Sequence, residues 1–218
     1  MRAHSSRLFT PVFLSLAILA PCAAQDLKPI VLPKPRMEGG KPLMQALKER
    51  KSTRGFSQEK LSAQTLSDML WAACGVNRPD GRRTAPSAMN SQEIDLYVAL
   101  PDGVYLYEPA PHRLSPVVAG DMRAKTGSQS FVAEAALNLV YVEDQARFKY
   151  AGAKPEEKFG FASFAAGAIA QNVYLFCASE GLAVVLRASA DKDALGKLLR
   201  LRPEQRVTYA QSVGYPKK

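Results

Sequence analysis

Five consecutive residues near the start of the chain carry groups that bind phosphate. Arg50, Lys51 and Arg54 supply three cations, and Ser52 and Thr53 supply two hydroxyls. A guanidinium can donate paired, charge-assisted hydrogen bonds to a phosphate, and a serine hydroxyl adds a short donor. A solvated basic helix end, which the helix dipole favours, has the same composition. The spacing alone leaves both interpretations open.

A second polar segment runs from residue 82 to residue 92 and leads directly into an apolar stretch. It contains Pro86, Ser87 and Asn90. The amide of Asn90 is both donor and acceptor, as is needed to read the edge of a heterocycle such as a flavin ring. Ordinary turn chemistry accounts for these three residues nearly as well.

A third segment, residues 165–172, is rich in alanine and glycine and lies inside a long helical pattern. Small side chains let another backbone approach closely. The helix is therefore expected either in the centre of the core or at a subunit interface, and the pattern does not choose between them.

The elements that must position these segments are mixed helices and strands. Helices are predicted from Pro42 to Arg50, after the Ser62 cap up to Gly75, over 156–180 and over 191–200. Strands are predicted at 93–100 and 104–107, which form a hairpin, and at 138–143, 182–186 and 206–213. Strands and helices do not alternate regularly, so an α+β layered fold is favoured over a doubly wound parallel sheet.

Composition and charge limit the kinds of ligand and partner that the protein is expected to bind. The chain has 218 residues with 29 Lys and Arg against 20 Asp and Glu, a net charge of +9, which suits an anionic ligand, a nucleic acid or an acidic membrane surface. Three cysteines, none in a Cys-x-x-Cys pair, and two histidines provide no set of ligands for a structural zinc site. No metal is expected.

Residues 1–24 are predicted to be a secretion signal. Arg2 and Arg7 precede an apolar stretch over 8–20, and Cys22-Ala23-Ala24 places small residues before a cut at Gln25. Removing this segment lowers the net charge from +9 to +7, because it takes away two arginines and no acid. The mature protein is expected to be exported to the periplasm or cell envelope, where a nucleic-acid partner is disfavoured.

The remaining chain is predicted to form one extended segment and one domain. Residues 25–40 hold three prolines and little periodicity, and are expected to lie extended over the surface of a domain formed by 41–218. Residues 19–22 also resemble a lipoprotein cleavage box, but Pro21 beside the cysteine fits that signal badly, so lipid anchoring is disfavoured. Cys74 and Cys177 are expected to be two buried, unlinked thiols, with a disulfide between them as the alternative.

Taken together and in this order, the segments resemble the nitroreductase family of FMN-dependent oxidoreductases. The resemblance spans roughly residues 42–216. The motifs that carry it are Glu49 to Arg54, Pro86 to Gln92, Gly167 to Asn172 followed by Gly181-Leu182, and Val213 to Pro216. The general pattern is most similar to the branch that includes the azoline dehydrogenases of peptide-toxin maturation.

The resemblance implies a fold, a cofactor and a site. Family members are homodimers with a mostly antiparallel central sheet flanked by helices, and they bind FMN at the dimer interface. Carried over, Arg50, Lys51, Ser52 and Arg54 would bind the FMN phosphate and ribityl chain, while Pro86, Ser87 and Asn90 would lie along the ring. The backbone at Arg187, Ala188 and Ser189 would provide an amide for the flavin N5 and O4 edge.

The function implied is that of an exported FMN-dependent oxidoreductase. Hydride transfer at flavin N5 would act on a small substrate, without any side-chain nucleophile. The alternative is a non-catalytic flavin or phosphate-ligand binding protein with the same fold. Because nicotinamide nucleotides are scarce outside the cytoplasm, an exported member would either use another electron donor or oxidise its substrate and pass the electrons onward, and the sequence leaves both open.

Two departures from the family pattern affect the site. The chain stops at Lys217 and Lys218, whereas many members continue with a basic segment, so these lysines are candidates to complete the phosphate site. The usual acidic or glycine residues beside N5 are replaced by Arg187, Ala188 and Ser189. An inward-pointing Arg187 would favour negatively charged reduced flavin or an acidic substrate, and an outward-pointing one would be surface charge.

Overall fold

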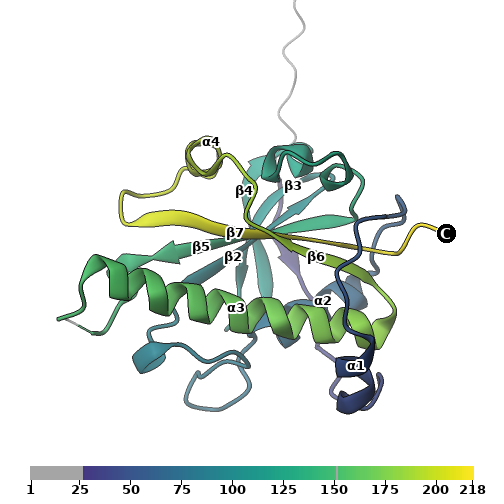
Figure 1. The fold of residues 1–218 in the computed structure, drawn as a ribbon, viewed down its shortest axis with the longest axis horizontal. Helices are drawn as coiled ribbons and strands as arrows, with labels where there is room; N and C mark the ends of the chain where they lie inside the picture. Colours follow the sequence, from purple (N-terminus) through teal and green to yellow (C-terminus); the bar gives the residue numbers. More distant parts are fainter. Residues whose placement is uncertain (1–26, 151) are drawn as a thin grey trace, which may run out of the picture.

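The computed structural model describes residues 27–150 and 152–218, so the predicted signal at 1–24 lies outside the described residues. A seven-stranded, entirely antiparallel sheet forms the centre (Figure 1), in the order β1-β4-β3-β2-β5-β7-β6. Its strands are β1 (Ile30–Val31), β2 (Ile94–Leu100), β3 (Gly103–Glu108), β4 (Arg113–Ala119), β5 (Leu137–Asp144), β6 (Ala183–Arg187) and β7 (Gln205–Gly214). The predicted α+β class with an antiparallel sheet is confirmed.

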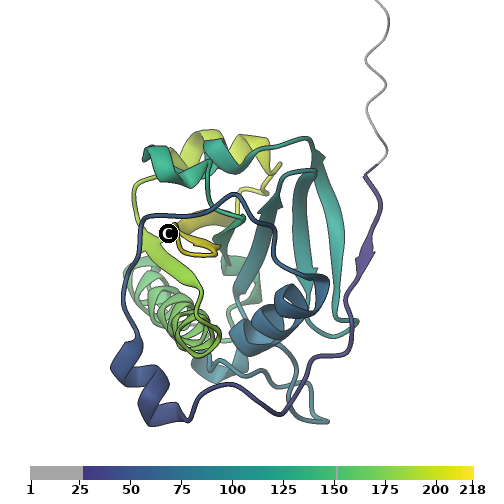
Figure 2. The same ribbon diagram turned by 90° about the vertical axis from the view of Figure 1, so that its right-hand side faces the viewer.

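Helices cover both faces of this sheet. α2 (Ala63–Cys74) and the long α3 (Pro155–Glu180) lie on one face, and α1 (Leu43–Glu49) sits beside the C-terminal end of α3 (Figure 1). α4 (Lys192–Leu198) lies on the opposite face, beside short 3₁₀ turns at Arg123–Thr126 and Ser130–Val132 (Figure 2). The sheet is thus buried between two helical layers.

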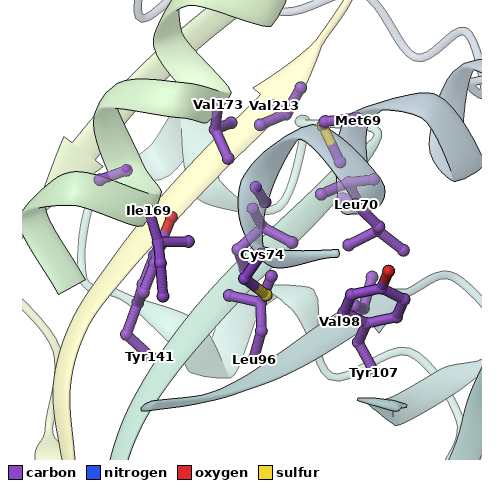
Figure 3. Close-up of a cluster of buried hydrophobic side chains, with 14 of the residues drawn as sticks. Met69, Leu70, Cys74, Leu96, Val98, Tyr107, Tyr141, Ile169, Val173 and Val213 are labelled. Atoms are coloured by element: carbon purple, nitrogen blue, oxygen red, sulfur yellow. The ribbon is translucent and has the colours of Figure 1, made fainter. Parts of the chain in front are cut away.

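The main core lies between the sheet and the α2–α3 pair. Figure 3 shows Met69, Leu70 and Cys74 of α2 facing Leu96 and Val98 of β2, with Ile169 and Val173 of α3 beside them. Alternate apolar side chains of β2 and β5 point to this face and belong to this core cluster, and the apolar side chains between them pack on the other face. Both strands are therefore mostly apolar in the sequence.

Local signals in the sequence explain where the helices begin and end. Ser62 caps α2, its Oγ accepting a hydrogen bond from the Thr65 amide at 3.0 Å. Gly181 ends α3 in the left-handed conformation at φ 72°, which glycine adopts without strain. The predicted helices and the 93–107 hairpin are confirmed, with bounds shifted by at most two residues.

The described part of the lead-in, residues 27–40, is attached to the sheet and to α2. Ile30–Val31 pairs with β4, and the Arg36 guanidinium forms a salt bridge at 2.8 Å with the nearly buried carboxylate of Asp68. β4 itself is not among the predicted strands, because Pro116 interrupts its pattern. This proline pairs with Tyr105 beside a register shift, where a sheet tolerates the missing amide.

Candidate functional site

A basic cavity of about 760 Å³ lies where α1, Arg50, Lys51 and Thr53 meet the C-terminal half of α3 and the start of β6. That volume is in the range of about 300–1,000 Å³ typical of small-molecule sites. Its charged lining is five cations, Lys41, Lys48, Arg50, Lys51 and Lys217, and one acid, Glu49. Glu49 is already paired with Lys41 at 2.6 Å, so the remaining charge of the cavity suits an anion.

Tyr174 of α3 positions two of the predicted phosphate-binding residues. The Arg50 guanidinium lies 5.3 Å from the centre of the Tyr174 ring, and Ser52 Oγ lies 2.8 Å from the Tyr174 hydroxyl. The Leu186 amide donates to the same hydroxyl at 2.8 Å. Tyr174 can therefore donate its own proton to Ser52, which leaves the Ser52 proton free for a ligand.

The C-terminal segment reaches this cavity through Lys217, one of the two lysines that the sequence offers to complete it. The Lys217 amide donates to the Gly55 carbonyl at 3.1 Å, and Pro216 pairs with Phe56. Lys217 consequently lines the cavity beside Arg50. Arg54 is exposed and does not line the cavity, so only part of the predicted cation set converges there.

A second cavity of about 570 Å³ opens beside the N-terminal half of α3. Pro86, Ser87 and Ala88 line one side of it, and Gly160, Phe161 and Phe164 of α3 line the other. Pro86 and Ser87 of the predicted ring-binding set are therefore brought together with two aromatic side chains. Phe161 and Phe164 were not among the residues expected at the site, although their i, i+3 spacing on the long helix places them on one face.

The 86–92 loop that borders this second cavity is held in an unusual conformation. Met89, Asn90 and Gln92 have positive φ values of 54°, 51° and 51°. The Gln92 amide donates to Ser87 Oγ at 2.9 Å, and Lys149 Nζ donates to the Asn90 carbonyl at 2.9 Å. Non-glycine residues seldom adopt this region, and clusters of them are found at binding sites.

The two groups of predicted site residues lie at opposite ends of α3. The phosphate-binding group contacts Tyr174, and the ring-binding loop adjoins Phe161. Thirteen residues of α-helix separate these two contacts, which is about 20 Å at 1.5 Å per residue. One chain therefore does not bring Arg50 and Ser52 together with Pro86 and Ser87.

Comparison with known proteins decides which family this architecture represents. The nitroreductase family model matches residues 47–215, most of the chain. The chain belongs to the nitroreductase family. A Methanocaldococcus jannaschii protein assigned to the nitroreductases is 28% identical over 170 residues, covering 73% of this chain and 85% of that protein.

Solved structures agree with this assignment. A nitroreductase-family crystal structure from Ralstonia eutropha JMP134 is 42% identical, with a TM-score of 0.82, and covers 87% of this chain and 90% of that one. The Escherichia coli microcin synthetase McbBCD complex, solved with truncated pro-MccB17 bound, shares the fold at 21% identity and a TM-score of 0.67, covering 98% and 79% of the two chains. Nitroreductases are oxidoreductases that generally use flavin cofactors.

Arg187 lines neither of the two cavities of this nitroreductase-family chain. Its side chain is buried on the sheet face opposite α3, where the guanidinium donates to the Thr126 carbonyl at 2.9 Å and to Asn138 Oδ1 at 3.1 Å. Of the two orientations left open by the sequence, the outward one, which would make Arg187 a surface charge, is wrong. Ala188 and Ser189 follow directly in the chain, and their role in binding a cofactor stays a prediction.

Both cysteines of the described residues are buried and unlinked, as predicted. The alternative disulfide is wrong. Burial raises the pKa of the Cys74 thiol to about 12 and that of Cys177 higher still, so neither forms a thiolate at neutral pH. Nucleophilic thiol chemistry is therefore not a function of these two residues.

Proposed function

We propose that this nitroreductase is an FMN-dependent oxidoreductase whose cofactor binds between two copies of the chain. The observation that carries the proposal is the separation of the two cavities at opposite ends of α3. A second copy with its α3 antiparallel to the first would bring the basic cavity of one chain to the apolar cavity of the other. Two equivalent sites would result from the twofold symmetry.

The outward face of α3 has the composition that such an interface needs. Gly160, Phe161, Phe164 and Gly167 are exposed and follow one another at helical spacing. Phe164 is 61% exposed, and a Cβ added at Gly160 or Gly167 would meet nothing within 4 Å. An exposed apolar stripe with room for a close neighbour is typical of a surface that another chain covers.

The residues of the two cavities fit FMN. Arg50, Lys51, Ser52 and Lys217 would hold the phosphate and the ribityl chain, since four donors with three positive charges match a phosphate dianion. Pro86 and Ser87 would lie against the ring, with Phe161 and Phe164 excluding water from it. Arg54, Asn90, Ala188 and Ser189 complete the proposed set.

When bound, FMN supplies two-electron redox chemistry at N5 of the ring. This chain would bind and orient the cofactor and shield it from water, and a backbone amide at 188–189 would hydrogen-bond the N5 and O4 edge. No cysteine or serine nucleophile is required. The substrate is proposed to be a small molecule that enters over the 86–92 loop.

The proposed cellular location of the protein and its proposed place within the family rest on the sequence. Residues 1–24 support export to the periplasm or cell envelope, and therefore an electron donor or acceptor that is available there. The motif pattern supports a place near the azoline dehydrogenases within the family.

FMN binding by an Arg50→Ala variant tests the phosphate site. Loss of one charge-assisted hydrogen bond costs about 1.5–3 kcal/mol, so we expect FMN to bind about tenfold to a hundredfold more weakly. The measurement is fluorescence titration of the refolded apoprotein with FMN. Arg113→Ala, on β4 beside the edge strand β1 and paired with Glu108, is the matched control and should bind FMN as the wild type does.

Four results bear on the proposal as a whole. Wild-type protein that binds no FMN, or an Arg50→Ala variant that binds it as tightly as the control, would contradict it. Wild-type protein that binds FMN and turns over a quinone or a nitroarene would support the oxidoreductase. Bound flavin that dithionite reduces, but that no donor and acceptor pair turns over, would instead support the non-catalytic binding protein.

A further inference from the structure

Arg187 is a buried cation that no carboxylate of residues 27–150 or 152–218 balances. The side chain is only 5% exposed, and none of the salt bridges among the described residues includes it. Burying a charge without an opposite charge beside it is costly. The neighbouring Arg123, by contrast, is paired with Asp121 at 2.7 Å.

Neutral oxygens alone hold the guanidinium. Nη1 donates to the Thr126 carbonyl at 2.9 Å, and Nη2 lies 3.1 Å from Asn138 Oδ1 and 3.4 Å from Thr126 Oγ1. Nε has no acceptor. These partners orient the cation without neutralising it, and burial lowers the pKa of Arg187 only to about 10, so it stays charged at neutral pH.

The surroundings are built to keep the guanidinium in this place. Asn138 Nδ2 donates to the Val132 carbonyl at 2.8 Å, and Ser212 Oγ donates to Asn138 Oδ1 at 2.5 Å, which turns that oxygen toward Arg187. A Cβ at Gly127 would overlap Nη1 of Arg187. The backbone of Gly127 is extended, at φ 177°, so the guanidinium rather than a backbone requirement explains the glycine.

The charge lies close to the segment that follows β6. The same hypothetical Cβ at Gly127 would lie 3.2 Å from the Ser189 carbonyl oxygen, so Gly127 is in contact with both the guanidinium and residue 189. Residues 188–189 are the segment proposed above to hydrogen-bond the flavin edge. The cation therefore sits behind that segment, sealed from solvent on the opposite face of the sheet.

We propose that Arg187 is a fixed positive charge that stabilises the reduced form of the bound flavin. This inference rests on the proposed FMN site. Adding two electrons and one proton to FMN leaves one additional negative charge on the ring, and a buried cation acts on that charge with little screening. Arg187 acts through space and does not contact the cofactor, and its effect is on the flavin midpoint potential.

The midpoint potential of the FMN-loaded dimer tests the proposal. In Arg187→Gln, the affinity for reduced FMN should fall at least about tenfold relative to the affinity for oxidised FMN. This corresponds to a fall of about 30 mV in the midpoint potential of a two-electron couple. Asn138→Asp, which places a carboxylate beside the retained arginine, should shift the potential in the same direction. Arg187→Lys keeps the charge and should stay close to the wild type.

A control variant and the possible outcomes distinguish a failure of this inference from a failure of the proposed FMN site. Arg113→Gln changes the net charge equally but lies on β4, five strands or about 24 Å across the sheet, and should leave the potential unchanged. An unchanged potential in FMN-loaded Arg187→Gln or Asn138→Asp overturns the inference, as does a shift in Arg187→Lys as large as that in Arg187→Gln. Wild-type protein without FMN would contradict the proposed function itself.

Discussion

Glu93 is a buried residue that neither cavity uses. Its side chain is fully buried at the start of β2, and neither carboxylate oxygen has a hydrogen-bond partner among the described residues. Burial raises the pKa of Glu93, and the negative charge of Glu143 raises it further, while Arg147 and Arg83 act in the opposite direction. The buried carboxylate of Glu143, unlike that of Glu93, forms a salt bridge with Arg206 at 2.6 Å.

Glu93→Gln should therefore stabilise the protein in a pH-dependent way. The pKa of Glu93 is higher in the folded chain than the value of about 4.3 in an unfolded one, so the folded state binds more protons and wild-type stability falls as pH rises between the two pKa values. We expect the variant to have the larger free energy of unfolding at pH 8, and the difference to vanish below about pH 4. Urea denaturation over this pH range measures it.

The exposed Glu59 offers a control for this experiment. Glu59→Gln removes the same charge from the surface and should change the stability little at any pH. A Glu93→Gln variant that is less stable than the wild type at pH 8 would show that the carboxylate is stabilised by its surroundings rather than penalised by burial.

α3 is the element that links the core to both cavities. Its inner face is made of alanines and other apolar residues packed on the sheet, including Ala166 and Ala170, which are buried within one chain. Its outer face presents Phe161, Phe164 and Gly167 to the surroundings. The inner face of the small-residue segment is thus part of the core of one chain, and its outer face is the proposed interface.

Substitutions on the two faces of α3 should have different effects. Phe164→Glu changes an exposed side chain, so we expect a monomer that unfolds like the wild-type chain but no longer retains FMN. Ala166→Leu overpacks the core and should cost about 1–3 kcal/mol of stability in each chain. Sedimentation velocity with absorbance at the flavin wavelength measures assembly and cofactor together.

A Phe164→Glu protein that remains a flavin-loaded dimer would contradict the proposed interface. So would a wild-type protein that sediments as a monomer with FMN bound. Because Ala166 is buried in the monomer, a large residue there tests core packing, and only a large or charged residue on the exposed face tests association.

Both ends of the described chain are attached to the rest of the fold by strand or bridge pairing. The lead-in joins the sheet through β1 and crosses α2 through the Arg36–Asp68 salt bridge. The C-terminus pairs with residues 55–56 and brings Lys217 to the basic cavity. The proposed phosphate site therefore depends on the last residues of the chain as well as on residues 50–53.

Expression of the complete chain in a Gram-negative host tests the proposed export. We expect the protein in the periplasmic fraction with a mass that corresponds to a start at Gln25, because the small residues at 22–24 suit a signal peptidase. Intact-mass spectrometry after fractionation measures both. Cytoplasmic protein that retains residues 1–24 would contradict export, and a lipid-modified Cys22 would contradict the expected cleavage site.

Features that depend on neighbouring residues were predictable from the sequence. The cap at Ser62, the helix end at Gly181 and the hairpin around residues 101–103 follow from local backbone preferences. The family followed from the order of short motifs, each of which is weak alone. β4 could not be predicted in this way, because its pairing with β3 compensates for Pro116 only in the folded sheet.

The sequence by itself determined the fold class, the family and the residue types of the site, because periodicity, capping and motif order are local properties of the chain. Only the tertiary structure decided how those residues are grouped. It placed the two halves of the proposed site at opposite ends of α3, put Tyr174 between Arg50 and Ser52, and buried Arg187 without a carboxylate. Each of these depends on contacts between residues far apart in the chain, where packing and desolvation rather than local preference set the free energy.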